Sequence, residues 1–235
     1  MIASPIILAL DGMPLEECVN LVSKVGSKVH AVKIHDLADT HGPVGAVAQL
    51  RDAGARRVWI DAKLHDIPNT VGLRAKAIAN SGADILTVHA GGGIDMMMAA
   101  VEKGPAEIYA VTVLTSLSEE EVHLGSGQPS KAAVLARARD AKLAGVNGIV
   151  CSPKEVGMLS RRPELSGLKF ITPGVRSAGA GANDQKRIAT PGEAFASGAT
   201  HIVVGREVTH APDPEKALNL IIEKGIPSDI FALKE

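Results

Sequence analysis

Short apolar runs alternate with longer amphipathic stretches along the chain, and this alternation limits the possible folds more than any other feature. Eight runs have the length and the near-continuous Ile, Val and Leu content of strands that are buried on both faces. These predicted strands cover residues 6–10, 29–34, 58–61, 85–89, 108–113, 148–151, 169–172 and 201–204. Strands of this kind form parallel sheets, in which helices connect one strand to the next.

The amphipathic stretches between the runs predict those helices. They cover residues 14–24, 44–53, 70–80, 94–102, 130–144, 153–159, 190–196 and 213–224. Four of them end at a glycine, as helices often do: Gly54, Gly82, Gly145 and Gly198. Eight such units in 235 residues predict an α/β fold, a single (β/α)8 TIM barrel domain over residues 1–235. A doubly wound sheet is the alternative, but residues 11–14 are not the Gly-rich turn that usually follows its first strand.

Composition excludes several classes of partner. With 25 basic and 26 acidic residues the net charge is -1, which argues against nucleic acid and anionic membrane. No apolar segment approaches the roughly 18 residues of a membrane span, and residues 1–10 read as a strand rather than a signal peptide. Cys18 and Cys151 are the only cysteines, which predicts a cytoplasmic location.

Charged residues gather where the first three predicted strands end. Asp11 follows the first, Lys33 lies near the end of the second, and Asp61, Lys63 and Asp66 follow from the third. The carboxyl ends of barrel strands meet around one mouth, where barrel enzymes hold their active sites. Acids and bases that alternate can neutralise one another there, so we expect a network of ion pairs.

The ends of later strands carry residues suited to an anion. Gly205 lets a bare backbone N–H approach a phosphate, and Arg206 follows it. Arg176 follows the seventh strand in the stretch Pro173-Gly174-Val175-Arg176, and a small, polar segment after it is typical of a lid that closes over a ligand. Gln185, near the far end of that segment, could donate a hydrogen bond to a phosphate.

In the chain's order, these segments resemble the orotidine 5′-phosphate decarboxylase family. The most specific match is Asp61-Ala62-Lys63-Leu64-His65-Asp66-Ile67-Pro68-Asn69-Thr70. The others are Leu8-Ala9-Leu10-Asp11, Val32-Lys33, Thr112-Val113-Leu114-Thr115-Ser116, Thr172-Pro173-Gly174-Val175-Arg176, Asp184-Gln185-Lys186-Arg187 and Val203-Val204-Gly205-Arg206. One stretch departs from the family, which usually has Val-Gly and a nearby acidic residue after the second strand's lysine where this chain has Ile34-His35-Asp36.

The resemblance implies the decarboxylation of orotidine 5′-phosphate to UMP, the last step of de novo pyrimidine synthesis, with no cofactor and no metal. By the same resemblance Lys63 donates a proton to C6 of the pyrimidine, flanked by Asp61 and Asp66, and Lys33 lies in the same charged network. The implied substrate contacts are Asp11, Lys33, Ile67, Thr70, Thr115, Ser116, Pro173, Arg176, Gln185, Gly205 and Arg206. The family is a homodimer in which Asp66 and Thr70 reach the neighbouring subunit's site.

Two other functions remain open. A barrel of the hexulose-phosphate synthase or keto-gulonate-phosphate decarboxylase type shares the Asp-x-Lys-x-x-Asp stretch but uses Mg²⁺. In that case Asp36 or Asp61 would be a metal ligand. A non-catalytic phosphate-binding barrel is the second alternative, and the intact set of Asp61, Lys63 and Asp66 argues against it.

Overall fold

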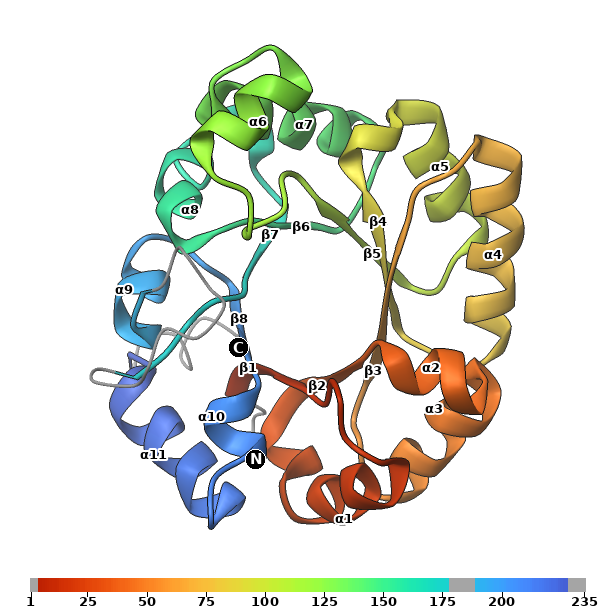
Figure 1. Cartoon of the computed structure of the whole chain (residues 1–235), viewed down its shortest axis with the longest axis vertical. Helices are drawn as coiled ribbons and strands as arrows, with labels where there is room; N and C mark the ends of the chain where they lie inside the picture. Colours follow the sequence, from red (N-terminus) through yellow and green to blue (C-terminus); the bar gives the residue numbers. More distant parts are fainter. Residues whose placement is uncertain (1–3, 178–188, 228–235) are drawn as a thin grey trace.

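Eight parallel strands close into a barrel in the computed structural model, which describes residues 4–177 and 189–227 (Figure 1). The strands are β1 Ser4–Ala9, β2 Val29–Ile34, β3 Val58–Leu64, β4 Ile85–His89, β5 Glu107–Val111, β6 Gly148–Val150, β7 Lys169–Thr172 and β8 His201–Val204. Each strand pairs with the next, and β8 pairs with β1 through Ile202 and Ile6, which closes the ring. The predicted (β/α)8 fold is confirmed.

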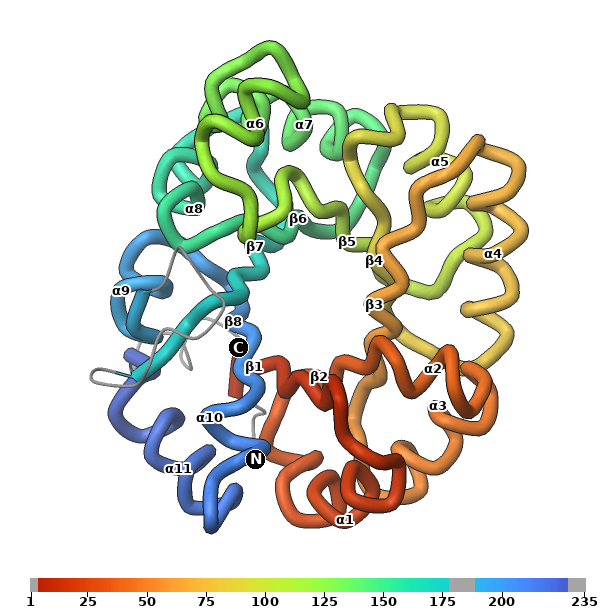
Figure 2. Tube along the Cα trace, in the orientation of Figure 1, coloured from red at the N-terminus to blue at the C-terminus, as the bar shows by residue number. Residues whose placement is uncertain are grey.

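The helices form an outer layer around the barrel, as the chain trace in Figure 2 shows. They are α1 Leu15–Val25, α2 Asp36–His41, α3 Pro43–Asp52, α4 Pro68–Asn80, α5 Ile94–Lys103, α6 Glu119–Ser126, α7 Ser130–Leu143, α8 Pro153–Leu159, α9 Pro191–Ala196, α10 Arg206–Thr209 and α11 Pro214–Gly225. All eight predicted helices are present. Gly54, Gly82, Gly145 and Gly198 have positive φ values of 103°, 82°, 80° and 102°, as helix ends require. None of the helices in the described ranges has the length and apolar content needed to cross a bilayer.

Three short helices, α2, α6 and α10, were not predicted. In α6 only Val122 is buried, so its sequence lacks the apolar stripe that reveals a longer helix. The helix begins instead with a capping box, in which the side chains of Ser118 and Glu121 each bind the other's backbone N–H. Local hydrogen bonds of this kind stabilise a short helix without marking it in the hydrophobic pattern.

The bounds of β2, β4, β7 and β8 are the predicted ones, and the carboxyl ends of the other four strands differ from the predicted ends by one to three residues. β1 ends at Ala9, before Leu10, and β5 ends at Val111. The largest difference is in β3, which continues to Leu64, beyond the predicted end at Asp61. The pairing of β3 with β4 shifts register between Ile60 and Leu64, so a bulge carries the strand past its acidic residue.

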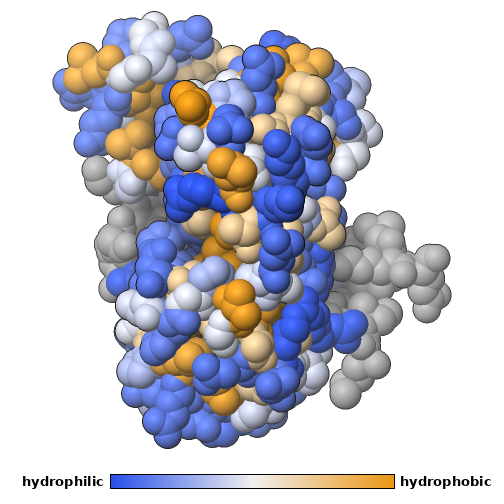
Figure 3. All heavy atoms as spheres, turned by 90° about the vertical axis from the view of Figure 1, so that its right-hand side faces the viewer, coloured by the Kyte–Doolittle hydropathy of each residue, from blue (hydrophilic) through white to orange (hydrophobic). Residues whose placement is uncertain are grey.

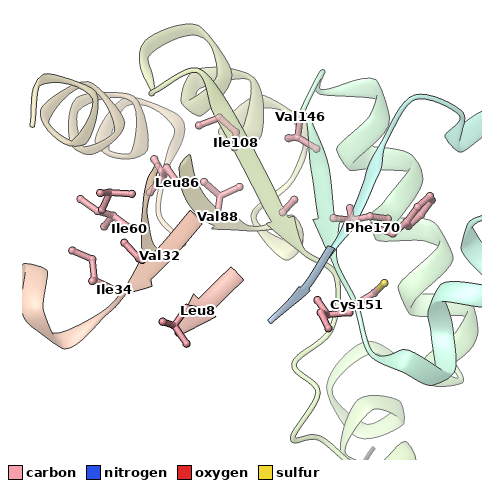
Figure 4. Close-up of a cluster of buried hydrophobic side chains, with 14 of the residues drawn as sticks. Leu8, Val32, Ile34, Ile60, Leu86, Val88, Ile108, Val146, Cys151 and Phe170 are labelled. Atoms are coloured by element: carbon pink, nitrogen blue, oxygen red, sulfur yellow. The ribbon is translucent and has the colours of Figure 1, made fainter. Parts of the chain in front are cut away.

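The core has two parts, one between the strands and the helices and one inside the barrel. Figure 4 shows part of the outer cluster, in which Leu8, Val32 and Ile60 come from the neighbouring strands β1, β2 and β3. The inner cluster consists of alternate strand residues: Ile7, Ala9, Ala31, Trp59, Ile85, Tyr109, Val111, Val150, Ile171 and Val203. The interior of the barrel is therefore filled with side chains rather than open. Its two large aromatic rings, Trp59 and Tyr109, meet edge to face with centroids 5.3 Å apart.

A network of ion pairs lies at the amino end of the barrel, centred on Glu107 at the start of β5. One carboxylate oxygen, Oε1, lies 2.8 Å from Nη2 of Arg57 and 2.8 Å from Nζ of Lys169. The hydroxyl of Tyr109 donates to Oε2 at 2.5 Å. Because the Glu107 side chain is only 14% exposed, losing its charge would leave two cations poorly paired.

Glu107→Gln is therefore expected to destabilise the fold by about 3 kcal/mol at pH 7. Burial alone would raise the pKa of Glu107, but hydrogen bonds from Lys169 and Tyr109 and the charge of Arg57 lower it from 4.5 to about 2. Since the folded pKa is depressed, this stability is present above about pH 4.5 and is lost as the pH falls towards 2. Urea unfolding of wild type and variant between pH 3 and 7 measures the difference, which should shrink in acid.

Glu164→Gln is the matched control, because Glu164 also pairs with an arginine, Arg139, but on the surface. Ion pairs on the surface contribute little to the free energy of unfolding, so this variant should unfold at the same urea concentration as the wild type. If both variants lost the same amount of stability, the Glu107 network would have no special role in holding the fold.

Candidate active site

A cavity of about 490 Å³ opens at the carboxyl ends of the strands. Its floor is apolar and includes Ala9, Val111, Val150 and Val203 from the inner cluster. Its walls carry six charged side chains: Asp11, Lys33, Asp61, Lys63, Arg176 and Arg206. The cavity thus combines an apolar base with charges of both signs around the rim, as sites for small polar ligands do.

Four of these side chains form the alternating network that the sequence predicts. Nζ of Lys33 lies 2.8 Å from both carboxylate oxygens of Asp11 and 3.2 Å from Oδ2 of Asp61. The same Oδ2 atom accepts a hydrogen bond from Nζ of Lys63 at 2.7 Å. Asp61 and Lys33 are each 8% exposed, whereas Lys63 is 33% exposed and Asp11 is 49% exposed. The order along the rim is acid, base, acid, base, with the inner pair buried.

The two buried members keep each other charged. Burial alone would raise the pKa of Asp61, but the charges of Lys33 and Lys63 lower it from 3.8 to about 2. Burial alone would lower the pKa of Lys33, but the charges of Asp61 and Asp11 raise it above its ordinary value. Asp61 is therefore a carboxylate and Lys33 an ammonium across the neutral pH range.

Lys63 has an unusual backbone conformation. Its φ is 46°, and within the described residues it is the only residue other than glycine with a positive φ. A side chain in this left-handed region is strained, and such strain is often found at functional sites. Together with the bulge between Ile60 and Leu64, this conformation directs the ammonium toward Asp61 and the cavity.

Most of the other predicted ligand contacts also line the cavity. Thr115, Pro173 and Gly205 lie on its wall with the two arginines. Arg176 is buried, and its Nη1 donates to the carbonyl oxygen of Val175 at 2.9 Å. Four predicted contacts do not line it: Ser116 is exposed, Gln185 falls outside the described residues, and Ile67 and Thr70 lie elsewhere.

Asp66, Ile67 and Thr70 lie apart from this cavity. They follow β3 at the start of α4, where Asp66 and Ile67 are exposed and Thr70 is half-buried. One carboxylate oxygen of Asp66 accepts a hydrogen bond from the backbone N–H of Ile67 at 2.7 Å. Within one protomer the predicted group of Asp61, Lys63 and Asp66 is therefore divided, and Asp66 makes no ion pair among the described residues.

Residues 34–36, which differ from the usual sequence of the family described above, do not leave Lys33 without acidic partners, because Asp11 and Asp61 both pair with its ammonium group. Asp36 instead accepts a hydrogen bond from the backbone N–H of Gly12, with 3.2 Å to each carboxylate oxygen. Across residues 4–177 and 189–227, no three His, Cys, Asp or Glu side chains are grouped as metal ligands.

Trp59 lines the cavity and was not predicted. The signal was the alternation along β3, since Trp59, Asp61 and Lys63 are two residues apart and share a side of the strand. Because its ring is apolar, Trp59 was predicted only as a core residue of the third strand.

A closed barrel with an acid–base network and two arginines at the carboxyl end of its strands defines a (β/α)8 enzyme of small anionic substrates. The model of the "Orotidine 5'-phosphate decarboxylase / HUMPS family" matches residues 4–221. The chain belongs to this family.

Relatives cover between 71% and 95% of the chain. An orotidine 5'-phosphate decarboxylase of Thermobifida fusca is 43% identical over 219 residues, covering 92% of this chain and 93% of the relative. An orotidine 5'-phosphate decarboxylase of Anaeromyxobacter dehalogenans is 51% identical over 169 residues, which cover 71% of this chain and 74% of the relative. The crystal structure of the Lactobacillus acidophilus orotidine 5'-phosphate decarboxylase is 33% identical, with a TM-score of 0.77, over 95% of this chain and 99% of that one.

Proposed function

We propose that the protein decarboxylates orotidine 5′-phosphate to UMP without a cofactor. The observation that carries the proposal is the Asp11–Lys33–Asp61–Lys63 network facing the cavity, whose inner pair is buried. In the reaction the bond between C6 and the carboxylate breaks, CO₂ leaves, and the electron pair stays on C6. The protein has to favour this charge distribution over that of the bound carboxylate.

Asp61 and Lys63 have different roles in the reaction: Asp61 destabilises the bound carboxylate, and Lys63 stabilises the charge that develops on C6. A substrate carboxylate about 4 Å from Asp61 is repelled by roughly 4 kcal/mol at an effective dielectric of about 20. The repulsion ends when the carboxylate becomes neutral CO₂. Lys63 attracts the charge that develops on C6, and its Nζ–H bond then supplies the proton that completes UMP. Lys33 holds Asp61 charged and in place through the 3.2 Å contact.

The magnesium-dependent alternative fits Asp61 less well. Its Oδ2 atom already receives two ammonium groups, at 2.7 and 3.2 Å, which compete with a divalent cation for the same oxygen. Asp36, the other candidate ligand, binds a backbone N–H.

An ultraviolet assay of orotidine 5′-phosphate loss tests the proposed function. We expect turnover without added metal and an unchanged rate in EDTA. A rate that EDTA abolishes and Mg²⁺ restores would favour the magnesium enzyme instead. Tight nucleotide binding without turnover would favour a non-catalytic barrel.

Arg176, Gly205 and Arg206 are proposed to hold the substrate phosphate, with Gln185 as a further contact. The first three line the same side of the cavity, and guanidinium groups suit a phosphate because they donate two parallel hydrogen bonds. Thr115 and Ser116 are proposed to contact the pyrimidine edge, and Asp11 is proposed to contact the ribose. Thr115, Asp11 and Pro173 line the cavity, which supports their assignment as substrate contacts.

Arg206→Ala is expected to weaken UMP binding by about 10- to 100-fold, because a charge-assisted hydrogen bond contributes about 1.5–3 kcal/mol. Uridine, which has no phosphate, should bind both proteins equally. Calorimetric titration measures both ligands, and Arg161→Ala, an exposed arginine after α8, is the control. If the wild type bound uridine as tightly as UMP, the phosphate assignment would be wrong.

We also propose a homodimer in which Asp66 and Thr70 complete the neighbouring subunit's site. The support is that Asp66, Ile67 and Thr70 lie outside their own cavity. Large apolar side chains are exposed on the same side of the molecule, with Ile67 65%, Leu73 59% and Met98 51% exposed. Figure 3 faces the side that carries α4 and α5, where apolar patches interrupt a hydrophilic surface. A second copy would cover them.

We also propose that the protein is cytoplasmic. Cys18 and Cys151 are both buried and unbonded to each other, as expected of thiols in a reducing compartment.

A further inference from the structure

An arginine of the outer helical layer reaches the loop that follows β5. Arg137, on α7, is half-buried, and its Nη1 donates a hydrogen bond to the carbonyl oxygen of Thr112 at 2.8 Å. Thr112 is buried and is the first residue after β5. The loop of residues 112–118 also contains Thr115, the proposed pyrimidine contact, which lines the cavity. Arg137 therefore binds the base of a loop that forms part of the site.

The neighbouring strand β6 does not supply a partner for the carbonyl of Thr112. The backbone N–H of Thr112 donates to the carbonyl of Val150 at 3.3 Å, as the pairing of β5 with β6 requires. In this parallel register the next hydrogen bond would run from the N–H of Ser152 to the carbonyl of Thr112. That N–H instead donates to the carboxylate of Glu155, in the first turn of α8, at 2.9 Å. A buried carbonyl without a donor costs free energy, so Arg137 provides a hydrogen bond that the sheet does not.

Arg137 also lies beside the turn that follows β4. Gly91 belongs to the short 3₁₀ helix of residues 90–92, and a methyl group added to it would lie 3.8 Å from the guanidinium carbon of Arg137. Within residues 4–177 and 189–227, Arg137 forms no ion pair with an acidic side chain. Its hydrogen bond to Thr112 is therefore its specific polar contact there, and a charged donor makes this bond stronger than a neutral one.

We propose that Arg137 is a positioning residue for recognition of the pyrimidine, which holds the carbonyl of Thr112 and thereby keeps Thr115 at the cavity wall. The inference rests on the proposed function, because it uses the assignment of Thr115 as a pyrimidine contact. Arg137 is not among the residues that line the cavity. Its loss should weaken contacts to the pyrimidine and spare the proposed phosphate contacts Arg176 and Arg206, because these follow β7 and β8 instead.

Arg137→Met removes the guanidinium and keeps an unbranched side chain that suits a helix, so it tests the proposal in the full-length protein. We expect UMP to bind about 10-fold more weakly, because a charge-assisted hydrogen bond that fixes the loop is lost. Ribose 5-phosphate, which has the phosphate but no pyrimidine, should bind within about threefold of its wild-type affinity. Calorimetric titration measures both dissociation constants.

Two further variants separate this role from a general effect on the fold. Arg137→Lys keeps a cationic donor, and it should restore most of the affinity for UMP because a single hydrogen bond, from Nη1, is involved. Arg139→Met is the matched control, because Arg139 lies on the same helix but pairs with Glu164 on the surface. This control should bind UMP and ribose 5-phosphate as the wild type does.

Three results would overturn the inference. They are an Arg137→Met protein that binds UMP within about threefold of the wild type, an equal loss of affinity for UMP and ribose 5-phosphate, and an Arg137→Lys protein as weak as Arg137→Met. A wild-type protein that binds UMP no more tightly than ribose 5-phosphate, and does not turn over orotidine 5′-phosphate, would overturn the proposed function. An active wild type that prefers UMP, with an Arg137→Met variant that behaves identically, would overturn this inference alone.

Discussion

Lys63→Ala is expected to lower turnover of orotidine 5′-phosphate by at least about 100-fold, because general acids contribute about 10²- to 10⁴-fold to a rate. The variant loses both the proton donor and the cation that attracts charge to C6. UMP should still bind measurably, since the proposed phosphate contacts lie on the other side of the cavity. The ultraviolet assay gives the rate, and titration with UMP gives the affinity.

Lys154→Ala is the control, because Lys154 is an exposed lysine on α8, away from the cavity. It should turn over like the wild type. A Lys63→Ala enzyme that kept more than about a tenth of the rate, a loss of less than about 1.4 kcal/mol, would remove Lys63 as the acid.

Two inactive variants are expected to restore activity to each other if Asp66 serves the neighbouring subunit. In a mixed dimer of Lys63→Ala and Asp66→Ala chains, one site lacks both residues and the other has both. Random association makes about half of the dimers mixed, so the pool should reach about one quarter of the wild-type activity per site. Co-expression of the two chains and an assay of the pooled dimers measures this recovery.

The control pool contains Lys63→Ala and the double variant Lys63→Ala/Asp66→Ala, in which no dimer has an intact site. It should remain inactive. If the first pool were equally inactive, while each variant was folded and dimeric, Asp66 would belong to its own subunit's site and the proposed exchange would be wrong.

Most of the fold could be predicted from the sequence because each strand buries both faces and each long helix has an apolar stripe. These periodic signals locate all eight strands and eight helices. The helix α6 was missed because its first turn is stabilised by the Ser118–Glu121 capping box and only Val122 is buried. The continuation of β3 to Leu64 was missed because a bulge replaces regular pairing there.

The candidate site could be predicted only where its residues follow strand ends. Asp11, Lys33, Asp61 and Lys63 do so, and their network has the predicted order. The positive φ of Lys63 could not be predicted, because the strain depends on the surrounding barrel. The hydrogen bond from Nε1 of Trp59 to Oγ1 of Thr87 depends on the register of β3 against β4, which a single sequence does not reveal.

The central claim is that the Lys63 ammonium, held by Asp61, delivers the proton to C6. A crystal structure of the complex with UMP tests it most directly. The account predicts Nζ of Lys63 within about 3.5 Å of C6, the distance of a reacting pair, while it still contacts Asp61. An ammonium that points out of the cavity, with another group closest to C6, would contradict the mechanism.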